Sequence, residues 1–154
     1  MLADIIPVAT GEKWIGYGVR SFQSVVHELI STASEELVMT VYVLTNLDIV
    51  YDLKNALERG VGVEIYLYRE EEQEENEAVR LILQLKNKYQ YLKIYQIENE
   101  MLHAKVLVAD GSKIISGSAN FTFGGMVKNY ELGFLVNNPT VALQILTLIK
   151  RLDS

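Results

Sequence analysis

The chain has 154 residues, 49% of them apolar, with a formal net charge of −6 and no cysteine. This length and apolar fraction suit one buried core, so we expect a single domain over residues 1–154. The lack of cysteine excludes a disulfide framework and a thiolate zinc site, and no stretch approaches the roughly 18 apolar residues of a membrane helix. The N-terminal segment carries Asp4 and no basic region, which is not typical of a secretory signal. We therefore expect a cytoplasmic protein that does not bind membranes.

Residues 21–33 predict the first helix. Apolar residues recur at helical spacing from Phe22 to Ala33, and Ser21 has the side chain of an N-cap. His27 lies off this apolar stripe, so we interpret it as an ordinary exposed histidine.

Residues 36–68 predict a β–α–β unit. The apolar run 36–44 is typical of a strand buried on both faces, and 61–68 predicts a second strand. Between them a helix runs from Asn46 to Arg59 and is stopped by Gly60. A crossover of this kind joins parallel strands with a right-handed connection.

The acidic run at 69–77 holds six of the 20 acidic residues, which leaves 14 acidic against 14 basic residues elsewhere. We interpret it as a solvated loop and the first turn of a helix over 74–87, where carboxylates suit the helix dipole. A metal-binding role is the weaker alternative, because nothing fixes the ligand geometry. A strand at 92–97 follows.

Asn138 and Pro139 predict the cap and first residue of a last helix that runs to about Arg151. Together with the preceding elements, this helix predicts an α/β domain with a mixed central sheet flanked by helices on both faces.

Residues 102–119 predict a β-hairpin. Asp110 and Gly111 form a strong two-residue loop signal, because both tolerate positive φ. With that loop Ala109 faces Ser112, and the same register pairs Lys105 with Ser116 and His103 with Ser118. Alternation then places five polar side chains on one face of the sheet: His103, Lys105, Ser116, Ser118 and Asn120. The same alternation directs three apolar side chains into the core: Val106, Val108 and Ile115.

This set of polar side chains suits phosphoryl transfer. Histidine is a nucleophile or general acid near neutral pH, while lysine, serine and asparagine donate hydrogen bonds to phosphate oxygens. Glu131, on an expected next strand, can accept the proton on one ring nitrogen of His103. We therefore predict a phosphohistidine mechanism that needs no metal and no cofactor. For His103 and Lys105 alone, the alternative is a chance pair on a half-exposed strand.

A longer pattern decides between these interpretations. His103, Lys105, Asp110, Gly117, Ser118 and Asn120 match H-x-K-x4-D-x6-G-S-x-N at every interval, and Asn129 and Glu131 match N-x-E. The chain thereby resembles the phospholipase D superfamily, and the order of its elements extends the similarity over roughly residues 20–150. The resemblance implies a phospholipase D-like α/β/α sandwich.

The resemblance also implies a role for each matched residue. His103 is the implied nucleophile or acid, Lys105 and Asn120 are phosphate ligands, Ser118 is a ligand or its support, and Glu131 orients His103. Structural or supporting roles fall to four other residues: Asp110, Gly117, Ser116 and Asn129.

One departure from the commonest family pattern concerns the number of motifs. Most members carry two motifs in one chain, so that one histidine attacks while the other protonates the leaving group. This chain has one, since His27 has no lysine two residues on. The resemblance therefore implies an active site shared across a homodimer.

Short single-motif members of the family include metal-independent endonucleases. The leading hypothesis is accordingly a nuclease that cleaves DNA or RNA, although no dense stripe of Lys and Arg supports broad phosphate affinity. Three alternatives stay open: a phospholipid or small-phosphodiester hydrolase, the nuclease module of a larger restriction-type enzyme, and a binding module with an unused site. The first lacks the support of an amphipathic basic helix or a lipid anchor.

Overall fold

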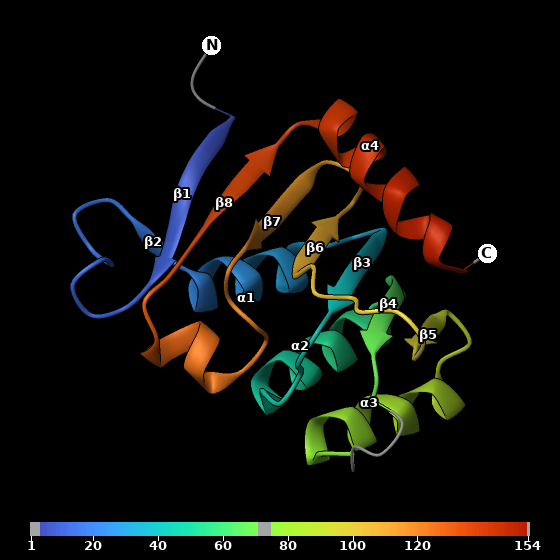
Figure 1. Ribbon diagram of the computed structural model, residues 1–154. Coiled ribbons are helices and arrows are strands. Elements are labelled where there is room, and N and C mark those ends of the chain that lie inside the picture. Colours follow the sequence, from blue (N-terminus) through green and yellow to red (C-terminus); the bar gives the residue numbers. More distant parts are fainter. Residues whose placement is uncertain (1–3, 71–74, 154) are drawn as a thin grey trace.

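The computed structural model describes residues 4–70 and 75–153. In this part of the chain, eight strands form one mixed sheet in the order β2-β1-β8-β7-β6-β3-β4-β5 (Figure 1). The strands are β1 (Ile5–Thr10), β2 (Arg20–Ser21), β3 (Glu36–Val41), β4 (Gly62–Tyr68), β5 (Leu92–Ile97), β6 (Val106–Ala109), β7 (Lys113–Gly117) and β8 (Glu131–Asn137). The helices are α1 (Phe22–Thr32), α2 (Leu47–Glu58), α3 (Glu77–Lys88) and α4 (Pro139–Lys150), with a π-helical turn η1 (Gly124–Lys128) and a 3-10 turn η2 (Arg151–Asp153).

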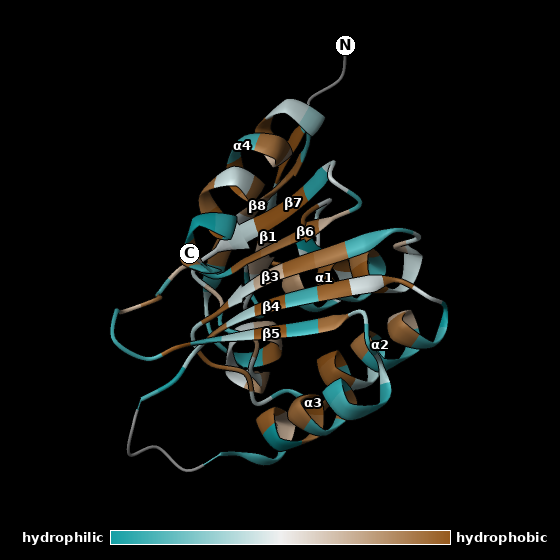
Figure 2. Cartoon of the chain, turned by 90° about the vertical axis from the view of Figure 1, so that its right-hand side faces the viewer, coloured by the Kyte–Doolittle hydropathy of each residue, from teal (hydrophilic) through white to brown (hydrophobic). Residues whose placement is uncertain are grey.

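The helices cover both faces of the sheet and bury two apolar layers. Helices α1, α2 and α3 pack on the face that carries Leu37 and Leu107. Helix α4 packs on the other face, against Val108 and Ile114. Figure 2 shows α4 on one side of the sheet and α1–α3 on the other. The predicted α/β fold with helices on both faces is confirmed.

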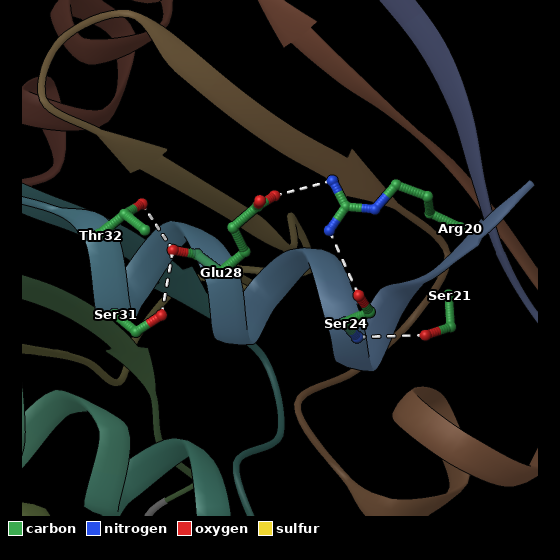
Figure 3. A network of polar contacts seen from close by, with 6 residues as sticks. All are labelled: Arg20, Ser21, Ser24, Glu28, Ser31 and Thr32. Carbon is green, nitrogen blue, oxygen red and sulfur yellow. Dashed lines mark hydrogen bonds and ion pairs between the residues drawn. The ribbon is translucent and has the colours of Figure 1, made fainter.

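Helix α1 begins as its sequence predicts. The Ser21 side chain accepts a hydrogen bond from the backbone N–H of Ser24, which satisfies a free donor of the first turn (Figure 3). Arg20, at the end of β2, donates to the Glu28 carboxylate at 2.7 Å and to the Ser24 hydroxyl at 3.2 Å. These contacts tie the edge strand β2 to the first two turns of α1.

The predicted β–α–β unit is also confirmed. Strands β3 and β4 run parallel, and Asn46 caps α2 by accepting from the N–H of Ile49. Gly60 follows the helix with φ of 91°, a conformation that suits glycine. None of the described helices is both long and apolar enough to cross a membrane.

Helix α3 begins later than predicted. Asn76 accepts from the N–H of Val79, and the helix starts at Glu77 rather than at residue 74. Asn76 supplies the side-chain oxygen that an N-cap needs, whereas the glutamates before it lack this short-range geometry. Residues 71–74 of the predicted acidic loop lie outside the described residues.

The C-terminal helix agrees with its prediction. The Asn138 side chain accepts from the N–H groups of Thr140 and Val141, and Pro139 occupies the first helical position.

Strand β1 is an addition that the sequence pattern did not predict. It pairs antiparallel with β8, so that Thr10 lies opposite Glu131. Pro7 interrupts its strand-like sequence, and β2 pairs only with Val8 and Ala9. Much of β1 is therefore a sheet edge, where a proline is tolerated.

Candidate active site

The β6–β7 hairpin carries the motif, and its register differs from the prediction. Val106 pairs with Ser116 and Ala109 with Lys113, so three residues form the loop instead of two. Asp110 and Gly111 do adopt positive φ, of 51° and 62°, and the N–H of Ser112 donates to the carbonyl of Ala109. The Ser112 carbonyl accepts from Asn138, however, and does not pair with Ala109. Ser112 is therefore an additional loop residue that shifts the pairing by one.

This shift overturns the predicted division of side chains between the two faces. Val106 and Val108 face the α4 layer together with Ile114, whereas Leu107 and Ile115 face the layer under α1–α3. The prediction that Ile115 shares a face with Val106 and Val108 is wrong, because a one-residue slip reverses the facing of one strand relative to the other.

His103 and Lys105 lie before β6, in a segment without regular strand pairing. Two hydroxyl groups fix its backbone. The buried Thr40 of β3 donates to the carbonyl of Ala104 at 2.9 Å and accepts from the N–H of Val106 at 3.1 Å. Ser116 donates to the carbonyl of Lys105 at 3.1 Å, so it supports the segment instead of facing a substrate. Thr40 was not among the predicted site residues.

The Lys105 ammonium group lies against the His103 ring. Its Nζ atom is 3.1 Å from Nδ1 and 3.3 Å from Nε2, and it donates to the His103 carbonyl at 2.9 Å. Lys105 is only 9% exposed. Burial lowers the pKa of Lys105, and the negative charge of Glu131 partly opposes this effect. A cation with few neighbouring acceptors is suited to binding an anionic ligand beside the imidazole.

Tyr42, also not predicted, forms the other wall beside His103. The two ring centroids lie 4.5 Å apart, and Lys105 Nζ lies 5.4 Å from the Tyr42 ring centroid. Tyr42 in turn stacks on Tyr68, with centroids 5.4 Å apart. Both tyrosines stand at the carboxyl ends of neighbouring parallel strands, a common position for ligand contacts in α/β sheets.

Glu131 joins two other motif residues into a second group. Its Oε1 accepts from the Ser118 hydroxyl at 2.6 Å, and its Oε2 accepts from the Asn129 amide at 3.3 Å. The N–H of Leu132 donates to the Ser118 hydroxyl oxygen at 3.1 Å, which fixes the serine from both sides. Within the described chain, these contacts occupy the carboxylate, and an orienting contact of Glu131 with His103 stays a prediction.

Asn120 contributes an unusual buried group. Its Oδ1 atom is buried and has no hydrogen-bond partner among the described residues. Unpaired buried acceptors are rare because they lose their hydration without compensation, and they often mark functional sites. The adjacent backbone is fixed, since the Phe121 N–H donates to Val43 and its carbonyl accepts from Thr45 and Asn46.

A close approach of two strands explains why the motif has a glycine at position 117. Gly117 pairs with Gly133 of β8, and a Cβ atom at Gly117 would lie 2.5 Å from the Gly133 Cα. Two facing glycines let β7 and β8 approach closely, next to Ser118 and Glu131. A side chain at either glycine would force these two strands apart.

Asp110 lies at the far end of the hairpin from His103. Its carboxylate accepts from the backbone N–H groups of Ser34, Glu35 and Glu36. Burial raises the pKa of the Asp110 carboxyl, but these hydrogen bonds outweigh it and hold the pKa below its ordinary value. The position fits a structural role rather than contact with a substrate.

A cavity beside the other histidine, His27, lies elsewhere. This cavity of about 340 Å³ between α1 and α2 is lined in part by His27, Asp48 and Asp52, and His27 Nδ1 is 2.8 Å from Asp52 Oδ2. His27 is exposed, as predicted. The two carboxylates disfavour an anionic ligand there, whereas the group around Lys105 carries a positive charge. Across residues 4–70 and 75–153, no cluster of three or more His, Asp or Glu is arranged to hold a metal ion.

The family model described as "Cardiolipin synthase, PLD-like domain" matches residues 26–152 of the chain. The chain belongs to the phospholipase D superfamily. Cardiolipin synthase A of Yersinia pseudotuberculosis serotype O:1b is 26% identical over 121 residues, which is 75% of this chain. The chain spans only 25% of the length of that phospholipase D-like relative.

Two solved structures show the same superfamily fold. Nuc from Salmonella typhimurium, a phospholipase D family member, matches with a TM-score of 0.78 and 24% identity, covering 96% of this chain and 92% of that one. NucT from Helicobacter pylori matches with a TM-score of 0.71 and 22% identity, covering 84% and 85% of the two chains. Nearly the whole of each structure is therefore a counterpart of this phospholipase D-like chain.

Proposed function

We propose that this protein is a metal-independent phosphodiesterase that cleaves DNA or RNA in the cytoplasm, with residues 1–154 as one catalytic domain. The observation that carries the proposal is the contact of the buried Lys105 ammonium with the His103 ring. A nucleophile and a cation suited to phosphate stand side by side, and Asn120 of the same motif carries an amide NH₂ group that can donate to a phosphate oxygen. The family membership supports the same chemistry.

The proposed reaction has two steps. A ring nitrogen of His103 attacks phosphorus, the bond from phosphorus to the leaving oxygen breaks, and a second imidazole donates a proton to that oxygen. Water then attacks the phosphohistidine, gives a proton to the second imidazole and releases the phosphate monoester. Lys105 and Asn120 donate hydrogen bonds to the phosphate oxygens, and Ser118 holds Glu131 beside them.

The second imidazole is proposed to be His103 of the partner subunit. The chain has only two histidines, and His27 lies in the separate cavity beside Asp52. Two half-exposed apolar residues of β8, Leu132 and Phe134, border Glu131 on the same strand and offer a surface for a second copy. A two-fold axis through this region would bring two equivalent sites together.

Mixed dimers test this arrangement. In an equal, fully exchanged mixture with His103→Ala subunits, about a quarter of dimers carry two intact histidines, assuming random pairing. Activity per wild-type subunit should fall by about half, because each mixed dimer is inactive. Activity that stays constant at every ratio, with exchange confirmed by tagged subunits, would refute the shared site.

A second candidate function is hydrolysis or transfer at a phospholipid phosphodiester, which the cardiolipin synthase family model favours. A substrate panel separates the candidates: single- and double-stranded DNA, RNA, phospholipid vesicles and bis-p-nitrophenyl phosphate. Nucleic-acid cleavage supports the nuclease proposal. Release of a lipid headgroup without nucleic-acid cleavage would replace the nuclease proposal with the phospholipid function. If no substrate of the panel is cleaved, the chain is a binding module or a part of a larger restriction-type enzyme.

A further inference from the structure

Three exposed aromatic side chains lie in the β1–β2 connection and directly before β8. Trp14 and Tyr130 are each 49% exposed, and Tyr17 is fully exposed at 104%. Trp14 and Tyr17 belong to the connection between β1 and β2, and Tyr130 directly precedes Glu131. We name Trp14, Tyr17 and Tyr130 the aromatic platform.

Tyr17 stands at the tip of a strained turn. Gly16 and Val19 exchange backbone hydrogen bonds of 3.2 and 2.9 Å, so Tyr17 and Gly18 form a two-residue hairpin loop. Both have positive φ, of 51° and 88°, as in a type I′ turn. A positive φ destabilises the fold when the residue is a tyrosine. Because the Tyr17 side chain is fully exposed, packing contacts do not offset this cost. A bulky ring held there at a cost indicates a ligand contact.

The other two rings are held in place. Trp14 and Tyr130 meet edge to face, with centroids 5.0 Å apart. Tyr130 lies over Gly11, where a Cβ atom would collide with its ring. The backbone of Trp14 donates to the Gly11 carbonyl, and the Arg20–Glu28 ion pair anchors the other end of the loop (Figure 3). The Trp14 and Tyr130 rings are therefore organised before any ligand binds.

The platform adjoins the proposed phosphate site. Thr10, the last residue of β1, pairs with Glu131, so the loop that carries Trp14 leaves the sheet next to the start of β8 (Figure 1). On the other side of the site, Tyr42 and Tyr68 stack above β3 and β4. The strand order places the phosphate-binding group between these two aromatic regions.

We propose that the aromatic platform stacks on unpaired bases of single-stranded nucleic acid whose phosphodiester lies at Lys105. This inference rests on the proposed function and names its substrate class. Base faces are accessible only when the strand is unpaired, and stacking on aromatic rings binds them with little sequence preference. The chain carries a net charge of −6, so stacking supplies affinity that a dense basic surface would otherwise give. Tyrosine hydroxyls and the indole N–H suit polar-edged bases better than acyl chains.

Trp14 allows a direct test, because it is the only tryptophan in the chain. In His103→Ala protein, which should not cleave, a single-stranded oligothymidine should quench its fluorescence with saturation. A blunt duplex of equal length should quench it far less at the same salt concentration. Equal quenching by both, or quenching only by phospholipid vesicles, would overturn the proposal.

Tyr17 provides the second test in the same background. Tyr17→Ala should weaken oligothymidine binding by about tenfold, the loss expected from one stacked base. Tyr51→Ala is the control, because Tyr51 is a half-exposed tyrosine on α2, outside the platform, and this variant should bind like the parent protein. Tyr17→Gly should raise the midpoint of urea unfolding and weaken binding together. Unchanged binding in both Tyr17 variants, a lowered midpoint, or dimer dissociation as the sole effect would each refute the platform.

Hydrolysis of bis-p-nitrophenyl phosphate by wild-type protein examines the catalytic proposal separately. Hydrolysis without any Trp14 response overturns the platform alone. A Trp14 response without hydrolysis supports the platform and overturns the proposed catalysis.

Discussion

Replacing Asp110 by asparagine should destabilise the fold without touching the candidate active site. One carboxylate oxygen accepts from the N–H groups of Glu35 and Glu36 at 2.8 and 3.0 Å. The other accepts from the N–H and hydroxyl of Ser34 at 3.0 and 3.5 Å. The single side-chain oxygen of asparagine can accept hydrogen bonds from only one of these two pairs of donors. Its NH₂ group, itself a donor, would then face the other pair. The backbone itself is unaffected, because asparagine also tolerates the φ of 51° found here.

The expected loss follows from these contacts. A hydrogen bond to a charged group contributes about 1.5–3 kcal/mol, and less where water can replace it. Ser34 is exposed, so water can replace part of its lost contact. We expect Asp110→Asn to lower the free energy of unfolding by about 2 kcal/mol at pH 7, a large share of the roughly 5–15 kcal/mol of a typical domain. Asp110→Ala should cost more, because it leaves all three N–H groups without an acceptor.

The pH dependence distinguishes this explanation from a general packing defect. The pKa of Asp110 is lowered by the fold, so its contribution is fully present above the unfolded pKa of about 3.9. It is lost as the pH falls through the folded pKa. Urea unfolding of both proteins should therefore give a constant difference above roughly pH 5 that shrinks below about pH 4. Equal stability at pH 7, or a difference that persists undiminished in acid, would refute the reasoning.

Three further predictions concern the candidate active site. Phosphodiesterase activity should survive excess EDTA, and strict dependence on magnesium in metal-depleted buffer would contradict this. Glu131→Gln should keep the fold by circular dichroism but lower turnover about 10–100-fold, as for other supporting carboxylates, whereas wild-type turnover would remove Glu131 from the mechanism. Because burial lowers the pKa of Lys105, diester binding should weaken at a lower pH than an ordinary lysine would allow. Lys105→Arg should move that alkaline limit of KM upward, and an unmoved limit would assign it to another group.

Local side-chain chemistry made much of this fold predictable. Three helices are each preceded by an N-cap residue whose side-chain oxygen accepts a hydrogen bond from the first turn: Ser21, Asn46 and Asn138. These signals act over three or four residues and depend little on the rest of the chain. The β–α–β unit followed from the same kind of local pattern, together with the handedness rule for crossovers.

Long-range pairing was less predictable. The hairpin register depends on Asn138, which lies 26 residues further along the chain. Its N–H group donates to the Ser112 carbonyl, which therefore does not pair with Ala109. The support of Ala104 and Val106 by Thr40 joins segments that are 64 and 66 residues apart in sequence. Asp110 and Gly111 alone describe the turn but not the contacts around it. The motif spacing selects Lys105, Ser118 and Glu131 as candidate site residues without reference to the register.

The pairing of β1 with β8 has a consequence for folding during synthesis. Strands β3, β4 and β5 and their helices can pair as soon as they leave the ribosome, since their contacts are local. The pairings of β8 with β1 and with β7 must wait until β8 emerges, and pairings between remote segments such as β1 and β8 form slowly. Until then β7 presents an open edge that can associate with other chains. A nascent chain without β8 also lacks Glu131, so the proposed phosphate site is assembled only when the sheet is closed.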